Sequence, residues 1–481
     1  MIRVLLLSLV AIGGLASAFA QAPQPPFNVP EFPANTPVTS SPEVTPSAEL
    51  PRGPTDEPPR PQEFISNSLE MESAESGNLE LPGGTTFHPM LGPLELKPTI
   101  QLRGRIEAEA NMASQSAQNK AAIGDLQNGY GFRRVRLGGQ GTIGDAVSWV
   151  SEVELAGGNV RLRDVFIGLD ALPGVRQLRV GNFREPYSLE GMTSTNFITF
   201  LERSTSNVIS PVRNWGVCGY WWPEDERRLF SFGIFRDGTG SNGQSNGDGN
   251  NWAYTTRLTG LPIYEPDGDV FRLMHWGGAF SHRLPPDGII NFTPRTGSSL
   301  LTVEDNPGSP FLPALMIPAS NYQLYNLQTA GVLGPLSVQA EWSAAAAQTT
   351  NMGPVFVHGM YVYGSYFLTG EHRGYNRTRG SFDQVAVFRP VIRSRTDPRG
   401  GLGAFELATR FGFFDFNSAN LPLDANGMPV GTLLYELTVG LNWYLNSYTR
   451  IMSDYTAGMP DKVGFGTTVA HLFGIRTAVY W

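Results

Sequence analysis

The residues best suited to chemistry in this chain are its arginines, which outnumber its lysines 32 to three. A guanidinium group is planar and always charged, and it binds carboxylate or phosphate oxygens through two parallel hydrogen bonds. Residues 101–184 contain 11 basic and eight acidic side chains, although the whole chain has a formal net charge of −8. This local excess predicts a surface that attracts small anions, and the net charge argues against a general nucleic-acid binder. The alternative is that each arginine pairs with a neighbouring glutamate as a solvated charge.

Other chemical motifs are weak. Residues 238–243 fit the spacing G-x-G-x-x-G, but Asn, Gly and Ser follow instead of a helix, which favours a flexible loop over a dinucleotide site. Asp237 and Asp248 lack the ordered acidic spacing of a calcium loop. The six histidines are scattered, and the sequence predicts no metal site and no cofactor. Ser281 and His282 read as polar residues at a strand end, so we predict no catalytic residues and no enzyme.

The arginines of the first third lie in segments of alternating polarity. In residues 100–110 every second side chain is charged or polar, and the intervening ones are Leu, Gly, Ile or Ala. Residues 132–142 and 147–155 repeat this pattern. Because successive side chains of a β-strand point to opposite faces, the pattern predicts strands with one wet and one apolar face. Arg133 falls on the apolar face, and only a β-bulge or a subunit contact would turn it toward the polar one.

Three longer segments near the C-terminus alternate in the same way. Residues 405–413, 435–445 and 471–481 each have aromatic and aliphatic side chains on one face and charged residues or Gly on the other. A transmembrane barrel requires this alternation, because its strands face lipid on one side and an aqueous lumen on the other. A soluble β-sandwich also alternates, but it seldom sustains such a length. We therefore predict an all-β, transmembrane antiparallel β-barrel.

The chain divides into three expected parts. Residues 1–20 have an early Arg, an apolar core and a small-residue site, which predict a signal peptide that is cleaved before Gln21. Residues 21–97 begin with a Pro-rich stretch and predict a disordered periplasmic tail and linker. Residues 98–481 would form the barrel, with length for about 16 strands. Cys218 is the single cysteine, so disulfides do not stabilise the fold.

Several ordered segments resemble the phosphate-selective porin O and P family. The similar segments are residues 132–138, 162–167, 180–190, 193–194, 201–204, 365–371, 405–410 and 440–446. The resemblance extends over residues 98–481. It implies a homotrimeric outer-membrane barrel of 16 strands, in which a third loop folds inward and narrows an Arg-lined pore that conducts anions.

The resemblance also implies the site residues. The inward loop would occupy residues 185–214, which lack strand alternation and are too long for an idle connection. The anion-binding or constriction residues would be Arg105, Arg133, Arg134, Arg136, Asp164, Ser194 and Thr195. The constriction loop would contribute Tyr187, Glu190, Thr193, Phe197 and Arg203. Gly191 and Asn196 stand where phosphate-specific members carry Lys, which implies a general anion preference and not tight phosphate selectivity.

We therefore expect an outer-membrane porin through which small anions diffuse passively, with phosphate and polyphosphate among the candidate solutes. Its partners would be these anions, outer-membrane lipid and two further copies of the chain. Three alternatives stay open: a general non-selective diffusion channel, a surface β-rich binding protein, and an enzyme built on a barrel. Bilayer conductance with a preference for anions would distinguish the anion-conducting porin from these three alternatives.

Overall fold

The computed structural model describes residues 98–238, 251–293, 300–303, 314–391, 400–418, 420–421 and 431–481. The predicted signal peptide and Pro-rich tail lie outside the described residues, as does most of the loop after Asp237. Within the described ranges no helix has the length and apolar character to cross a membrane.

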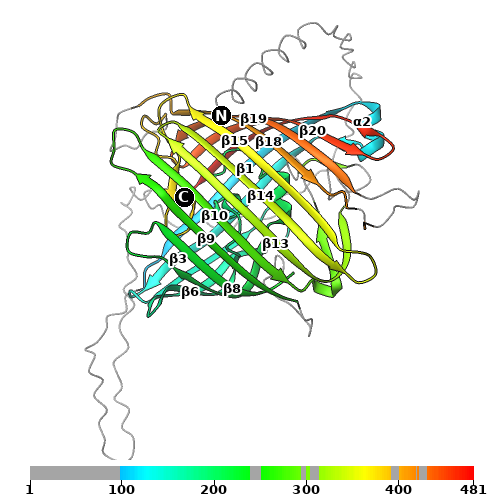
Figure 1. Ribbon diagram of the computed structural model, residues 1–481. Coiled ribbons are helices and arrows are strands. Elements are labelled where there is room, and N and C mark those ends of the chain that lie inside the picture. Colours follow the sequence, from blue (N-terminus) through cyan, green and yellow to red (C-terminus); the bar gives the residue numbers. More distant parts are fainter. Residues whose placement is uncertain are drawn as a thin grey trace, which may run out of the picture. The chain divides into compact units, whose positions relative to one another are not determined.

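Sixteen long antiparallel strands among the described residues form one closed ring (Figure 1). They are β1 Gln101–Gln115, β3 Gly129–Ile143, β4 Val147–Glu154, β5 Arg161–Leu172, β6 Val175–Arg184, β7 Arg213–Trp221, β8 Arg228–Arg236, β9 Trp252–Glu265, β10 Arg272–Arg283, β13 Leu315–Leu333, β14 Leu336–Thr349, β15 Val355–Phe367, β18 Ala404–Asp415, β19 Thr432–Asn446, β20 Thr449–Lys462 and β22 Ala470–Tyr480. Each strand pairs with the next, and β22 pairs with β1 and closes the barrel. The predicted 16-stranded barrel is confirmed.

The alternating sequence decides which face of each strand is wet. In β22, Phe473 and Ile475 are each 44% exposed on the outer surface, whereas the next residue, Arg476, is 1% exposed and points into the barrel. In β18, Leu407 is exposed on the outside while Glu406 is fully buried within. Lipid accepts only apolar side chains at this depth, so the charged residues turn inward. The lumen is therefore lined and partly filled by polar groups.

The connections hold the remaining elements. They are α2 Ala117–Ile123 and β2 Leu126–Gln127 after β1; α3 Leu189–Met192 and the 3₁₀ helix η1 Thr205–Ile209 after β6; the 3₁₀ turn η3 Pro286–Gly288, β11 Ile289–Phe292 and β12 Thr302–Val303 after β10; β16 Gly374–Asn376 and β17 Ser381–Asp383 after β15; and β21 Gly466–Thr467 after β20. Tight turns such as residues 334–335 and 447–448 mark one end of the barrel, which we call the turn end.

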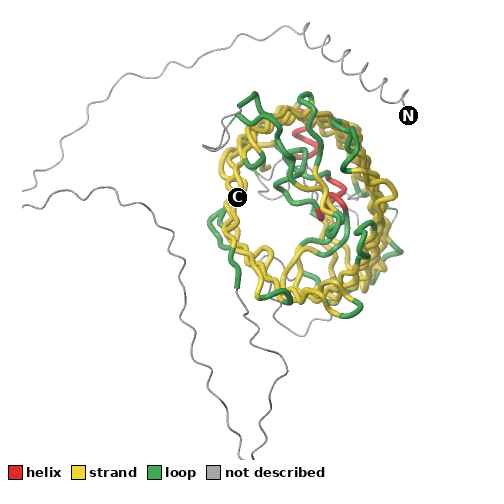
Figure 2. The backbone as a smooth tube through the Cα atoms, turned by 90° about the vertical axis from the view of Figure 1, so that its left-hand side faces the viewer, coloured by secondary structure: helices red, strands yellow, loops and turns green. Residues whose placement is uncertain are grey.

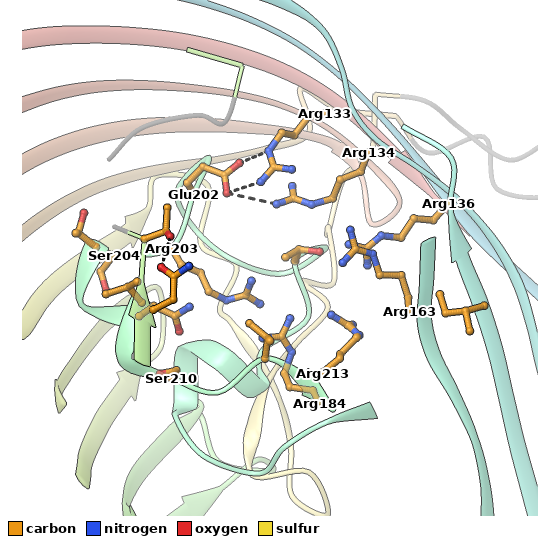
Figure 3. A pocket seen from close by; sticks show the side chains of 18 residues that line it. Arg133, Arg134, Arg136, Arg163, Arg184, Glu202, Arg203, Ser204, Ser210 and Arg213 are labelled. Atoms are coloured by element: carbon orange, nitrogen blue, oxygen red, sulfur yellow. Dashed lines mark hydrogen bonds and ion pairs between the residues drawn. The ribbon is translucent and has the colours of Figure 1, made fainter. Parts of the chain in front are cut away.

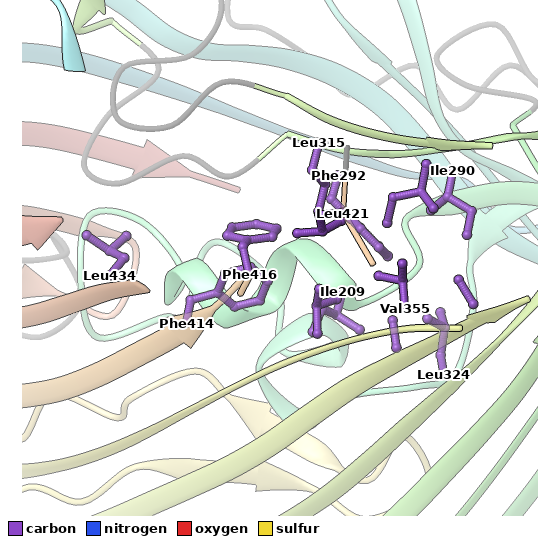
Figure 4. Packing of buried hydrophobic residues seen from close by; sticks show 14 of the residues in the cluster. Ile209, Ile290, Phe292, Leu315, Leu324, Val355, Phe414, Phe416, Leu421 and Leu434 are labelled. Atoms are coloured by element: carbon purple, nitrogen blue, oxygen red, sulfur yellow. The ribbon is translucent and has the colours of Figure 1, made fainter. Parts of the chain in front are cut away.

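Connecting segments cross the inside of the ring, as the view of Figure 2 shows. One of them is the connection from β6 to β7, the third at the end opposite the turn end, since its Leu201 backbone is hydrogen bonded to the inward side chains Asp454 and Arg476. The predicted inward-folded third loop is confirmed. Ile209 of this connection belongs to an apolar cluster that also contains the wall residues Val355 and Phe414 and Phe292 of β11 (Figure 4). These contacts fix the loop to the side of the barrel formed by β14, β15, β18, β20 and β22, which we call the far wall.

The orientation of the two faces predicts the cost of a misplaced charge. Leu441 lies near the middle of β19 and is 45% exposed on the outer surface. Leu441→Arg should destabilise the folded barrel by about 2–4 kcal/mol, because the guanidinium would enter the centre of the bilayer. Tyr366→Arg, at the turn end of β15, should cost only about 0–1 kcal/mol. Urea titration of folding into lipid vesicles measures both values, and equal costs would contradict the assigned faces.

Candidate functional site

The inward loop comprises residues 185–212. The prediction extended it to residue 214, but Arg213 and Asn214 begin β7 and pair with Arg184 and Phe183 of β6. The loop carries the short elements α3 and η1 and otherwise has irregular backbone. Because it lies inside the barrel and belongs to no sheet, its backbone N–H and C=O groups need hydrogen-bond partners from elsewhere. Wall side chains supply many of them.

Carboxylates from the far wall accept hydrogen bonds from the loop's N–H groups. Glu341 of β14 accepts from the backbone N–H groups of Leu189 and Glu190, at 2.8 and 2.6 Å, where α3 begins. Asp454 of β20 accepts from the N–H of Leu201 at 2.7 Å. Both carboxylates are thereby committed to holding the loop.

Arginines from the same wall donate to the loop's carbonyl groups. Arg450 of β20 donates to the carbonyl of Ile198 at 2.9 Å. Arg476 of β22 donates to the carbonyl of Leu201 at 2.6 Å. Arg410 of β18 donates to the carbonyl of Glu202 at 3.0 Å and lies over the Phe200 ring. A charge-assisted hydrogen bond is stronger than a neutral one, so these contacts tie the loop firmly to the far wall.

Glu190 closes the loop on itself. Its carboxylate accepts hydrogen bonds from the Ser204 N–H and hydroxyl groups, each at 3.1 Å. Arg203 donates to the carbonyls of Glu190 at 2.8 Å and Thr193 at 2.7 Å. Burial raises the pKa of Glu190, which lies in the loop and not in a spanning strand, from 4.5 to about 7; Arg410 opposes this and Glu341 adds to it. Near neutral pH this group is therefore partly protonated.

On its other side the loop faces a cavity of about 600 Å³ (Figure 3). Seven arginines line the cavity: Arg133, Arg134, Arg136, Arg163, Arg184, Arg203 and Arg213. Glu202 is the one acidic side chain among the described lining residues. Thr195, Ser204, Thr205 and Ser210 contribute hydroxyl groups. The cavity thus combines a strong excess of positive charge with neutral hydrogen-bonding groups.

Four of these arginines are held by carboxylates. Glu202 accepts from Arg133 at 2.6 and 3.0 Å and lies 3.4 Å from Arg134. Arg134 also pairs with Glu107 of β1 at 2.5 Å. The remaining pairs of this group join Arg136 to Glu152 at 3.0 Å and to Glu154 at 2.7 Å, and Arg213 to Asp164 at 2.7 Å. These pairs orient the guanidinium groups and neutralise part of their charge.

Arg133 reaches the cavity because of a β-bulge. The register of β1 against β3 shifts at this point: Glu107 pairs with Arg134, whereas Ala108 pairs with Phe132. Arg133 is the extra residue, and the bulge turns its side chain toward Glu202 (Figure 3). The β-bulge that the sequence analysis required for an inward Arg133 is therefore present.

The other three arginines are less neutralised. Within the described part of the chain, Arg184 and Arg203 form no ion pair with a carboxylate, and Arg163 approaches Glu154 only at 3.5 Å. The Nε of Arg163 is buried and has no hydrogen-bond partner. In Figure 3 their side chains point into the same cavity. Like charges near one another repel, so these three guanidinium groups leave positive charge in the cavity that no close carboxylate fully neutralises.

The structure brings some predicted site residues together and separates others. Arg133, Arg134, Arg136, Thr195 and Arg203 line the cavity. The following predicted residues do not line it: Arg105, Asp164, Tyr187, Glu190, Thr193, Ser194 and Phe197.

The residues outside the lining have other contacts. Arg105 lies beneath the loop and donates to the Thr195 hydroxyl. Tyr187 packs in the apolar cluster at 1% exposure, and Phe197 packs edge-on against Tyr480. Thr193 donates its hydroxyl hydrogen to a carbonyl of α3. These residues shape the loop, and Arg105 aims Thr195.

Sequence reasoning missed Arg163, Arg184, Glu202 and Arg213 as site residues. Arg163 and Arg184 contribute to the basic excess of residues 101–184, so a signal for them was present. Glu202 lies in a segment that resembles the family, but its partners on β3 and β22 are known only from the fold.

The family model "Phosphate-selective porin O and P" matches residues 100–481. One relative is an uncharacterized protein of Caulobacter vibrioides, which is 28% identical; the match covers 76% of this chain and 71% of the relative. Another is Porin O of Pseudomonas aeruginosa, which is 23% identical; the match covers 62% of this chain and 70% of Porin O. A similar solved structure is the anion-selective porin from Comamonas acidovorans, with a TM-score of 0.48, 11% identity, and coverage of 80% of this chain and 100% of that one.

The raised pKa of Glu190 predicts a pH-dependent stability. The folded state holds a proton on Glu190 up to about pH 7, whereas the unfolded chain releases it near 4.5, so the free energy of unfolding should fall between these pH values. The loss should be about 3 kcal/mol and should level off above pH 7. Glu190→Gln should remove this part of the pH dependence.

Thermal unfolding in detergent between pH 4 and 8 measures this pH dependence of the stability. Glu265→Gln, at a surface pair with Arg272 that is more than half exposed, is the matched control and should keep the wild-type profile. Identical profiles for wild type and Glu190→Gln would refute the assignment.

Proposed function

This chain belongs to the phosphate-selective porin O and P family, and we propose that it conducts small anions in preference to cations. As a member of this family it is an outer-membrane porin, a passive channel for small solutes and not an enzyme. The observation that carries the proposed preference is the cavity at the inward loop, where seven arginines face one glutamate. An anion entering this cavity gains attraction that a cation does not.

The magnitude of this attraction depends on the surroundings. Two unit charges 4 Å apart interact by about 1 kcal/mol in bulk water and by about 4 kcal/mol at the effective dielectric near a protein surface. The loop displaces water from part of the lumen, so the arginines act closer to the second value. Binding must still be shallow, because a tightly held anion would block the passage instead of crossing it.

The lining favours anions with several oxygens as solutes. A guanidinium group donates two parallel hydrogen bonds to phosphate or carboxylate oxygens, and the Thr195 hydroxyl, which accepts from Arg105, can donate a further one. At Gly191 a Cβ atom would lie 2.4 Å from the Ser188 hydroxyl that caps α3, so a lysine there would displace this hydroxyl from the cap. These features support a general preference for anions and not a dedicated phosphate site.

A general non-selective diffusion channel is the second candidate. The ion pairs that neutralise Arg134 and Arg136 favour it, because paired charges attract mobile ions weakly. The two candidates differ in the ratio of anion to cation permeability, which stays near one for a non-selective channel.

We further propose that residues 1–20 direct export, that residues 21–97 lie in the periplasm, and that the barrel assembles as a homotrimer in lipid. The signal pattern and the family support these proposals, since an even-stranded barrel has both termini on the periplasmic side. Protease added to intact cells should leave the N-terminal tail uncut. Its removal under these conditions would mean that the topology is inverted.

The two least neutralised wall arginines, Arg163 and Arg184, provide the sharpest test of anion preference. Arg163→Gln with Arg184→Gln should lower the anion-to-cation permeability ratio by about fivefold, or roughly 1 kcal/mol, because both lost charges are weakly neutralised: Arg163 lies 3.5 Å from Glu154, and Arg184 has no ion pair among the described residues. Reversal potentials across a planar bilayer under a potassium chloride gradient measure the ratio.

Arg272→Gln is the control, since this arginine is 57% exposed at the turn end and lies outside the cavity. It should leave the ratio unchanged. A ratio near one in the wild type would favour the non-selective channel, and an unchanged ratio in the double variant would remove the two arginines from the site.

A further inference from the structure

The outer wall of the barrel has an apolar groove of about 450 Å³ across β6, β7 and β8, near the turn end. Val217, Trp221, Phe230 and Phe232 line it and are 38–48% exposed on the outer surface. The residues between them, such as Cys218 and Leu229, are buried on the lumen side. The groove therefore faces the membrane and is separate from the arginine cavity.

The groove exists because one outward position lacks a side chain. Gly219 pairs with Leu178 on one side and with Phe232 on the other, so it lies at the centre of an apolar surface. The nearest atom to a Cβ built at Gly219 would be Val175 Cγ1, at 3.6 Å. A Cβ atom would therefore fit there without a clash, although the residue is glycine.

Basic side chains flank the turn end of this groove. Arg176 shares the outer face of β6 with Leu178, and its Nε donates to the Trp222 carbonyl at 3.0 Å. Arg228 shares the outer face of β8 with Phe230. Both arginines are exposed, and within the described residues neither forms an ion pair.

The turn from β7 to β8 adds carboxylates beyond these arginines. Glu224 and Asp225 are exposed at its tip. From the middle of the membrane toward the turn, the wall therefore presents an apolar groove, then guanidinium groups, then carboxylates. A phosphatidylethanolamine has the complementary order, which is an acyl chain, then a phosphate, then an ammonium group.

We propose that this groove binds one phosphatidylethanolamine of the leaflet that faces the periplasm. An acyl chain lies over Gly219, the phosphate contacts Arg176 and Arg228, and the ammonium group lies near Glu224 and Asp225. The leaflet follows from the short turns, which face the periplasm in outer-membrane barrels. The neighbouring Trp221 and Trp222 lie at the depth where aromatic girdles meet the headgroups. The inference does not depend on anion selectivity.

Native mass spectrometry of the full protein, extracted in mild detergent and supplied with phosphatidylethanolamine, tests the site. Gly219→Val fills the opening, and Arg176→Gln with Arg228→Gln removes the phosphate contacts. Each should reduce the bound lipid at least fivefold relative to wild type. Gly331→Val is the matched control, since Gly331 also faces outward near a turn and the nearest atom to its Cβ would be the Leu273 carbonyl oxygen at 3.9 Å.

The control should retain lipid as the wild type does. Equal lipid retention in all variants would overturn the proposal. So would dissociation of an oligomer by Gly219→Val without loss of lipid, because the groove would then hold a second copy of the chain. Folding of each variant is checked by heat-modifiable mobility on gels, and the double Arg variant gives a second reading if Gly219→Val folds poorly.

Discussion

The structure depends on one requirement: the backbone of a loop inside the barrel must be hydrogen bonded although it has no sheet partner. Side chains of the far wall meet this requirement. Glu341 and Asp454 accept from its N–H groups, and Arg410, Arg450 and Arg476 donate to its carbonyls. These charges are used in positioning, so they are not available to passing ions.

The consequence is a division of the lumen. On the far wall, charged groups of both signs hold the loop and are covered by it. On the wall formed by β1 and β3 to β7, glutamates such as Glu107 and Glu154 lie behind the arginines and orient them, while the cavity side is almost wholly basic. The inward loop thus narrows the lumen and decides which charges face it. Arg203 of the loop itself belongs to the basic side.

The sequence predicted the barrel well, because lipid and water impose the two-residue alternation on every spanning strand. Inward Glu406, Arg410 and Arg476 follow from that alternation alone. Arg133 could not be placed from alternation, because a bulge in β3 turns it inward. The partners of Glu202 come from β3 and β22, far away in the chain, and only the closed ring brings them together. The connection from β15 to β18, residues 368–403, was not predicted to be long, since turns at its end of the barrel are normally short.

The central claim is that the arginines beside the inward loop hold anions. Anomalous diffraction from crystals soaked in sodium bromide tests it most directly. The account predicts a bromide peak in the cavity within contact distance of Arg163, Arg184 or Arg203. A cavity without a peak, or a rubidium peak there in a parallel soak with rubidium chloride, would contradict it.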